Sequence, residues 1–258
     1  MIHALLAVAG VVAIAATWAW LFERAMRKQR GLFFHWPIRT VSLPEIDPVF
    51  RQEALGPALS TEVALVGGSG VMQLPGGTSD TEAWILAVLA KRARLMFEFG
   101  TCTGRTAYLW ARNSAPDARV VTLTLSAAEI AAYHREAGDT GSATKRAIDE
   151  SVFDRFYYSD TPYAAKVKQL FGDSKAFDET PWAGQCDLVF VDGSHAKSYV
   201  QSDSKKALRM VKPGGLVLWH DYRGHRLAGV FDTLNGLARE LPLVHIRTTS
   251  LVAYRRPA

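Results

Sequence analysis

The sequence contains few cysteines, and this shortage excludes two kinds of site. Its 258 residues include only Cys102 and Cys186. No group of cysteine and histidine has the spacing of a zinc site. We expect no disulfide either, because the two cysteines are predicted at opposite ends of neighbouring parallel strands, too far apart to bond. The chain is therefore expected to work in a reducing compartment.

The net positive charge of the chain is not gathered into a nucleic-acid-binding surface. The formal net charge is +5 and the isoelectric point is about 9.2. The basic residues are spread along the sequence, apart from one cluster at 24–30. Nucleic-acid readers commonly show a stripe of Lys and Arg with interleaved aromatic residues, which is missing here. A nucleic-acid partner is therefore not favoured.

One long uncharged run lies near the start of the chain. A helix over residues 4–22 spans roughly 28 Å, close to the hydrocarbon thickness of a bilayer. Aromatic residues end the run and the basic cluster follows, an order that favours a cytoplasmic location for the rest of the chain. The run predicts a transmembrane anchor at 1–22, a single-pass protein of the inner membrane and the membrane as a partner. A cleaved signal peptide is the alternative, but the charged start of such a peptide is missing.

The segment after the anchor is predicted to be a connection. Residues 23–75 hold the basic cluster and five prolines, which divide the segment into short pieces. We expect a juxtamembrane basic segment and linker at 23–75, with one or two short helices, and a single domain at 76–258. Near the start of that domain, Ser79 followed by Glu82 is typical of a helix beginning.

Within the domain, strand-like apolar runs alternate with helical patterns. Helices are predicted at 106–113, 127–136 and 200–211. Strands are predicted at 95–99, 119–125, 167–171, 188–191, 216–219, 244–247 and 251–254. This alternation predicts an α/β fold with a doubly wound, mostly parallel seven-stranded sheet and an antiparallel strand near its end. The long connection at 126–163 is typical of a lid or substrate loop.

The turn after the first strand lacks the glycines of two common nucleotide-binding motifs. Cys102 and Arg105 stand where the further glycines of a G-x-G-x-x-G fingerprint would fall. A phosphate-binding loop needs four residues between its glycines and then Lys, whereas three residues separate Gly100 from Gly104. What remains is Glu-x-Gly-x-x-x-Gly-x-Thr. A strand, turn and helix of this kind direct backbone N–H groups at a ligand beyond the strand end.

A second group of polar residues follows two later strands. One buried run ends in Asp192, with His195 three residues on, and another ends in His220 and Asp221. Ligands of a parallel sheet lie at the carboxyl ends of its strands. We therefore expect these residues on one rim of the sheet: Glu98, Gly100, Asp192, His195, His220 and Asp221.

Together these segments resemble the class I S-adenosylmethionine-dependent methyltransferases. The resemblance is to methyltransferase domain family 24 and, more distantly, to catechol and caffeoyl-CoA O-methyltransferases. It rests on segments 97–101, 172–174, 187–195, 212–215 and 219–222. It implies methyl transfer from S-adenosylmethionine to a hydroxyl oxygen. The predicted anchor adds the expectation that the acceptor is small or membrane-associated, such as a glycan or a lipid.

The resemblance also implies roles for individual residues. It places these residues around the cofactor: Glu98, Gly100, Thr101, Gly104, Thr106, Thr124, Asp173, Ser174 and Asp192. It places these in catalysis: His195, Asp192 and Asp221. The implied metal ligands are Asp192 and Asp221, and Mg²⁺ is the expected ion. We add His220 as a third ligand in place of the family's amide, although it could instead orient Asp221. His195 stands where the catechol enzymes carry a catalytic lysine, and histidine suits proton removal because it titrates near neutral pH.

Two positions depart from the family pattern. The second strand usually ends in an acidic residue that binds the ribose hydroxyls, but Thr124 stands there and puts cofactor affinity in doubt. Tyr222 stands where the catechol enzymes have an amide ligand, and this weakens the metal assignment. Two alternatives therefore stay open. One is a non-catalytic scaffold that keeps the fold, and the other is a nucleotide-cofactor oxidoreductase, against which the missing third glycine argues.

Overall fold

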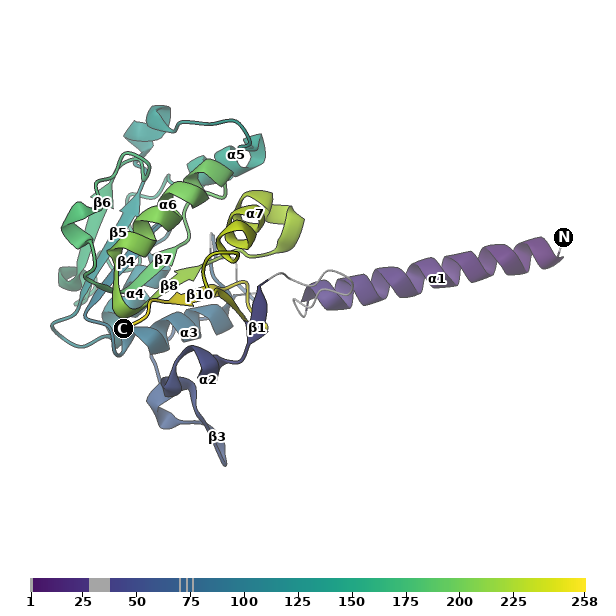
Figure 1. Cartoon of the computed structure of the whole chain (residues 1–258), viewed down its shortest axis with the longest axis horizontal. Helices are drawn as coiled ribbons and strands as arrows, with labels where there is room; N and C mark the ends of the chain where they lie inside the picture. The colour runs from purple at the N-terminus through teal and green to yellow at the C-terminus, as the bar shows by residue number, and fades with distance from the viewer. Residues whose placement is uncertain (1, 28–37, 70, 73, 76) are drawn as a thin grey trace.

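An eight-stranded sheet forms the centre of the domain, with helices on both of its faces (Figure 1). The computed structural model describes residues 2–27, 38–69, 71–72, 74–75 and 77–258. The strand order is β1-β9-β10-β8-β7-β4-β5-β6, and β10 alone runs antiparallel to its neighbours. The strands are β1 (Arg39–Val41), β4 (Leu95–Phe99), β5 (Arg119–Thr124), β6 (Val167–Phe171), β7 (Cys186–Val191), β8 (Val211–Trp219), β9 (Val244–Ile246) and β10 (Val252–Arg255).

The helices cover the sheet because its inner strands are apolar on both faces. Met96 and Phe97, neighbours in β4, belong to different apolar clusters, one on each side of the sheet. Both faces of these strands are thus buried, which explains why their sequences are continuous apolar runs. The helices are α1 (Ile2–Arg27), α2 (Leu43–Ile46), α3 (Asp80–Ala90), α4 (Arg105–Asn113), α5 (Gly141–Asp149), α6 (Lys197–Met210) and α7 (Ala228–Leu237). Helices α3 and α4 pack on one face, and α6 and α7 pack on the other.

The predicted α/β alternation is confirmed, with two differences. The sheet has eight strands instead of seven because β1, from the segment predicted as a linker, pairs with β9 at one edge. Three residues are too few for a visible alternation pattern. The helix predicted at 127–136 is a 3₁₀ helix, Ala127–Ala132, and α5 follows it in the same long connection. A separate hairpin, β2 (Gln52–Glu53) and β3 (Gly56–Pro57), lies outside the sheet.

The apolar run near the N-terminus forms α1. The helix continues past residue 22 into the basic segment, so the predicted end of the anchor is not a structural boundary. Among the described residues, no helix is both long and apolar enough to cross a membrane. The transmembrane anchor predicted at 1–22 is therefore not supported by the structure. The inner-membrane location and the membrane partner stay predictions from the sequence.

Arg105 ties the segment before α3 to the start of α4. Its guanidinium is 4% exposed and donates to the carbonyl oxygens of Val66 and Thr78, at 2.7–2.9 Å and 2.6 Å. It also pairs with Asp80 at 2.8 Å. These contacts hold the entry to α3 beside the glycine turn, where the candidate site lies.

We expect Arg105→Ala to lower the free energy of unfolding by about 2–4 kcal/mol, because the buried carbonyl oxygen of Thr78 and the half-buried one of Val66 would lose a charged donor. Urea unfolding followed by circular dichroism measures this change. Arg119→Ala, which removes an exposed arginine at the start of β5, is the control and should cost no more than about 0.5 kcal/mol. Equal effects of the two substitutions would contradict the assigned role.

Candidate active site

The ends of β4, β7 and β8 lie side by side and bring the predicted polar residues onto one rim. These strands are parallel neighbours in the sheet, so their carboxyl ends meet at one edge. Ligand atoms of Asp192, His195 and Asp221 all lie within 4.8 Å of one another. Glu98 lines one cleft together with Asp192. The predicted convergence is confirmed.

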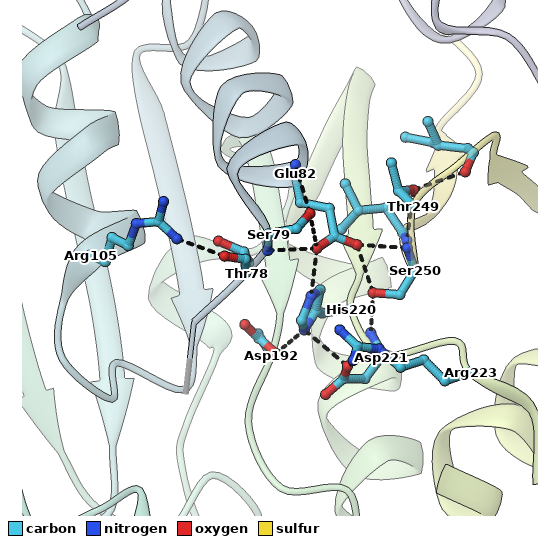
Figure 2. Close-up of polar contacts among 12 residues, drawn as sticks. Thr78, Ser79, Glu82, Arg105, Asp192, His220, Asp221, Arg223, Thr249 and Ser250 are labelled. Atoms are coloured by element: carbon cyan, nitrogen blue, oxygen red, sulfur yellow. Dashed lines mark hydrogen bonds and ion pairs between the residues drawn. The ribbon is translucent and has the colours of Figure 1, made fainter. Parts of the chain in front are cut away.

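His220 is held between carboxylates on both sides of its ring (Figure 2). Its Nδ1 lies 2.9 Å from Asp192 Oδ1 and 3.5 Å from Asp221 Oδ1. Its Nε2 lies 3.3 Å from Glu82 Oε2. His220 is 6% exposed and Glu82 is 1% exposed, so the contact between these two side chains is almost fully buried.

Glu82 joins the rim to two further segments, and the sequence analysis identified it only as part of a helix start. Its Oε2 accepts from the backbone and hydroxyl of Ser79, which forms the expected capping box of α3. Its Oε1 accepts from the backbone and hydroxyl of Ser250, at 2.6 Å and 2.8 Å. Ser250 Oγ in turn accepts from the backbone N–H of Asp221 at 3.3 Å. No local pattern signals these contacts, since Ser250 lies far from Glu82 in the sequence.

Burial and neighbouring charges move the pKa values of this cluster in opposite directions. Burial raises the pKa of Asp192, although His220 opposes the shift. Burial would also raise the pKa of Asp221, but the charges of His220 and His195 outweigh it and hold that pKa well below its ordinary value. Burial would lower the pKa of His220, but Asp192 and Asp221 raise it well above its ordinary value. His220 is therefore an imidazolium between carboxylates.

The structure favours His195, not His220, as the histidine available to a ligand. His195 Nε2 lies 2.7 Å from Asp221 Oδ2, but both ring nitrogens are buried without a well-oriented hydrogen bond among the described residues. Both nitrogens of His220 already face carboxylates. The metal set of Asp192, Asp221 and His220 stays a prediction, and the ligand atoms that cluster within 4.8 Å of one another are those of Asp192, His195 and Asp221.

The glycine turn lets the end of β4 run directly beside the end of β7. Gly100 has φ +99°, and a Cβ added there would lie 2.1 Å from the backbone oxygen of Asp192. Gly104 has φ +73°, and a Cβ added there would lie 2.8 Å from the Phe156 Cβ and from the Tyr158 ring. Gly100 therefore permits a close approach at the site, whereas Gly104 serves packing behind it and lines neither of the clefts described next.

Two clefts open on the rim and contain most of the residues predicted around a cofactor. The first cleft is lined in part by Thr124, Asp173 and Ser174. The second cleft is lined in part by Glu98, Thr101 and Thr106. Gly100 and Asp192 line both clefts. Thr124, at the end of β5, thus lies at the cleft as predicted. It supplies a hydroxyl where the family pattern has an acidic residue.

Further acidic residues that no sequence motif marked also line the first cleft. Glu150, just after α5, lines both clefts from the long connection. Asp203 in α6 is 1% exposed, and burial raises its pKa to about 7. The sequence signal for Glu150 is a general one, since a long connection over a parallel sheet commonly covers the ligand. Asp203, within α6, has no such signal.

Glu98 lies at the end of β4 and is 2% exposed. Its Oε2 accepts from the Thr122 hydroxyl at 2.6 Å, and Thr122 is 2.8 Å from the Thr101 hydroxyl. The pKa of Glu98 is raised from 4.5 to about 8. Burial is the main cause, and the charge of Asp192 adds to the shift. Glu98 therefore carries a proton at neutral pH.

The raised pKa of Glu98 makes folding stability depend on pH. The unfolded carboxyl ionises above pH 4.5 while the folded one keeps its proton, so stability falls as the pH rises from about 4.5 to about 8. We expect Glu98→Gln to remove this loss and to be more stable than the wild type by roughly 1–4 kcal/mol at pH 8, with a small difference at pH 4.5. Thermal unfolding across this range tests it, with Glu129→Gln as control. A difference that does not change with pH would contradict the assignment.

Comparison with known proteins gives a family for this geometry. Residues 97–222 match the family described as methyltransferase domain (Methyltransf_24). The O-methyltransferase TomG of Streptomyces achromogenes, in complex with S-adenosylmethionine, has 21% identity, a TM-score of 0.46 and coverage of 70% of this chain and 82% of its own. The Bacillus cereus O-methyltransferase has 19% identity, a TM-score of 0.48 and coverage of 73% and 87%. No curated protein matches the chain.

The family match covers the part of the chain that builds the site. It begins in β4 and ends just after Asp221, so it includes the glycine turn and the ends of β7 and β8. Both clefts lie over these strand ends. This match argues against the oxidoreductase alternative. The protein is therefore a class I S-adenosylmethionine-dependent methyltransferase that carries this family's domain.

Proposed function

We propose that this methyltransferase acts on a hydroxyl oxygen of its acceptor, with His195 as the general base. The observation that carries the proposal is the buried pair of His195 and Asp221, 2.7 Å apart, beside Asp192 on the rim of both clefts. A hydroxyl needs to lose a proton during methylation, and a positioned imidazole is the side chain best suited to accept it.

The chemistry is a single displacement. The acceptor oxygen forms a bond to the methyl carbon as the carbon–sulfur bond breaks, and the hydroxyl proton passes to His195. The carboxylate of Asp221 stabilises the resulting imidazolium at its Nε2 side. Gly100 and Asp192 fix the floor of the clefts, so much of the rate would come from holding donor and acceptor in line.

The cofactor contacts are part of the same proposal. The residues that line the clefts and would surround the cofactor are Glu98, Gly100, Thr101, Thr106, Thr124, Asp173, Ser174 and Asp192. Thr124 supplies one hydroxyl where the resemblance in sequence leads us to expect a carboxylate. Gly104 supports this set through packing alone.

A divalent cation fits the cluster of Asp192, His195 and Asp221. Two carboxylates and an imidazole are ordinary ligands of such ions, and both nitrogens of His195 lack a well-oriented hydrogen bond among the described residues. The imidazole makes Mn²⁺ or Fe²⁺ as suitable as the predicted Mg²⁺. A cation there would lower the pKa of the acceptor hydroxyl. It would do so in place of proton removal by His195, because a neutral imidazole has one acceptor nitrogen and the cation would occupy it.

The proposal does not extend to a membrane-associated acceptor. That prediction rested on the transmembrane anchor, which the structure does not support. A screen of hydroxyl compounds and cell extracts with methyl-labelled S-adenosylmethionine would identify the acceptor.

We expect His195→Gln to lower kcat by roughly 10²–10⁴-fold, the contribution typical of a general base. Binding of S-adenosylhomocysteine, measured by calorimetry, should change less than about threefold, since His195 lines neither cleft. The control is His134→Gln, which replaces an exposed histidine. Unchanged methyl transfer by His195→Gln would exclude His195 as the base.

We expect Mn²⁺ to bind the wild type in calorimetry, and Asp221→Asn to weaken this binding at least about tenfold, because the amide lacks the ligand charge. Asp117→Asn, which removes an exposed carboxylate elsewhere, should bind as the wild type does. Equal binding of Mn²⁺ by all three proteins would contradict the metal site, whether or not a chelator affects activity.

A further inference from the structure

The two clefts share part of their lining. The residues that line both are Gly100, Cys102, Glu150 and Asp192. Three of them belong to the strand ends and the turn after β4. Glu150 comes from the other side, at the end of α5 in the long connection at 126–163. The junction between the clefts therefore has an acidic residue on each side.

The inference rests on the proposed function, which places the two halves of the cofactor in different clefts. The first cleft contains Thr124, Asp173 and Ser174, proposed for the nucleoside half. The second contains Glu98, Thr101 and Thr106, proposed for the methionine half. In S-adenosylmethionine the sulfonium sulfur joins these halves. The junction of the clefts is thus the place for the positive charge.

Glu150 is the carboxylate at this junction that makes no direct contact with a cation among the described residues. Its side chain is half-buried, and its carboxylate accepts no hydrogen bond and forms no ion pair among the described residues. Asp192, on the opposite side, already faces His220 at 2.9 Å. A carboxylate taken partly out of water without a partner is unfavourable, and a cation of the ligand would remove that cost.

Neighbouring charges support the position of Glu150 over the rim. Burial raises its pKa. The charges of His195 and Arg146 oppose the shift, and the charges of Asp192 and Asp221 add to it. The carboxylate of Glu150 is therefore within electrostatic range of the catalytic cluster, although no atom of that cluster bonds to it among the described residues.

We propose that Glu150 is a specificity-determining residue that binds the sulfonium charge of S-adenosylmethionine. Methyl transfer converts the sulfonium to a neutral thioether, so this attraction is present for the donor and absent for the product S-adenosylhomocysteine. Glu150 thereby favours binding of S-adenosylmethionine and release of S-adenosylhomocysteine.

Calorimetry with three ligands tests the proposal: S-adenosylmethionine, S-adenosylhomocysteine, and sinefungin, in which an amine-bearing carbon replaces the sulfonium. We expect Glu150→Gln to raise the Kd of the two ligands charged at this position by about tenfold, as for loss of a charge-assisted contact. The Kd of S-adenosylhomocysteine should change less than about twofold. Glu150→Asp, which keeps the charge, should retain a preference for the charged ligands.

Asp149→Asn is the matched control. It removes the same charge one residue away, where the carboxylate is exposed and pairs with Lys145. It should leave the ratio of the Kd values as in the wild type. Thermal unfolding of each variant checks that it folds.

Two results would overturn the proposal. One is an unchanged ratio of Kd values in Glu150→Gln, and the other is an equal loss for all three ligands, as a purely structural role would give. These results differ from failure of the proposed function itself, in which the wild type would bind none of the three ligands.

Discussion

The placement of His220 between carboxylates of different elements fixes the geometry of the site. Its ring joins Asp192 at the end of β7 to Glu82 in α3, and Glu82 continues the contacts to Ser250. A buried carboxylate or imidazolium alone is costly, so each charge here depends on the next. The rim, the start of α3 and the turn before β10 are therefore held as one unit.

The second constraint is steric and acts at Gly100. The backbone oxygen of Asp192 lies where a side chain at that position would begin. The same contact thus sets the floor of the clefts and the position of the carboxylate above it. This arrangement leaves His195, whose ring nitrogens have no well-oriented hydrogen bond among the described residues, as the histidine available to a ligand. The two histidines of the rim consequently have different roles. His220 fixes the geometry of the site, and His195 is the histidine proposed for the chemistry.

Much of the fold could be predicted from the sequence because the inner strands carry strong local signals. Each is an apolar run followed by a turn, and the structure confirms them from β4 to β10. The elements that were predicted wrongly, or not predicted, lie where local signals are weak. Strand β1 has three residues and gains its hydrogen bonds from β9 alone. The segment at 127–132 closes as a 3₁₀ helix, although its alanines favour an α-helix in isolation.

The chemical groups at the strand ends can be read from the order of residues, because alternating strands and helices bring the carboxyl ends of parallel strands to one edge. Glu98, Asp192, His195 and Asp221 could therefore be assigned to a common rim. The pairing of those groups depends on three-dimensional packing, and so does the position of Glu150, which forms no ion pair among the described residues. Glu82 and Glu150 reach the rim from segments distant in the sequence, and no local pattern encodes the distance between side chains of separate elements.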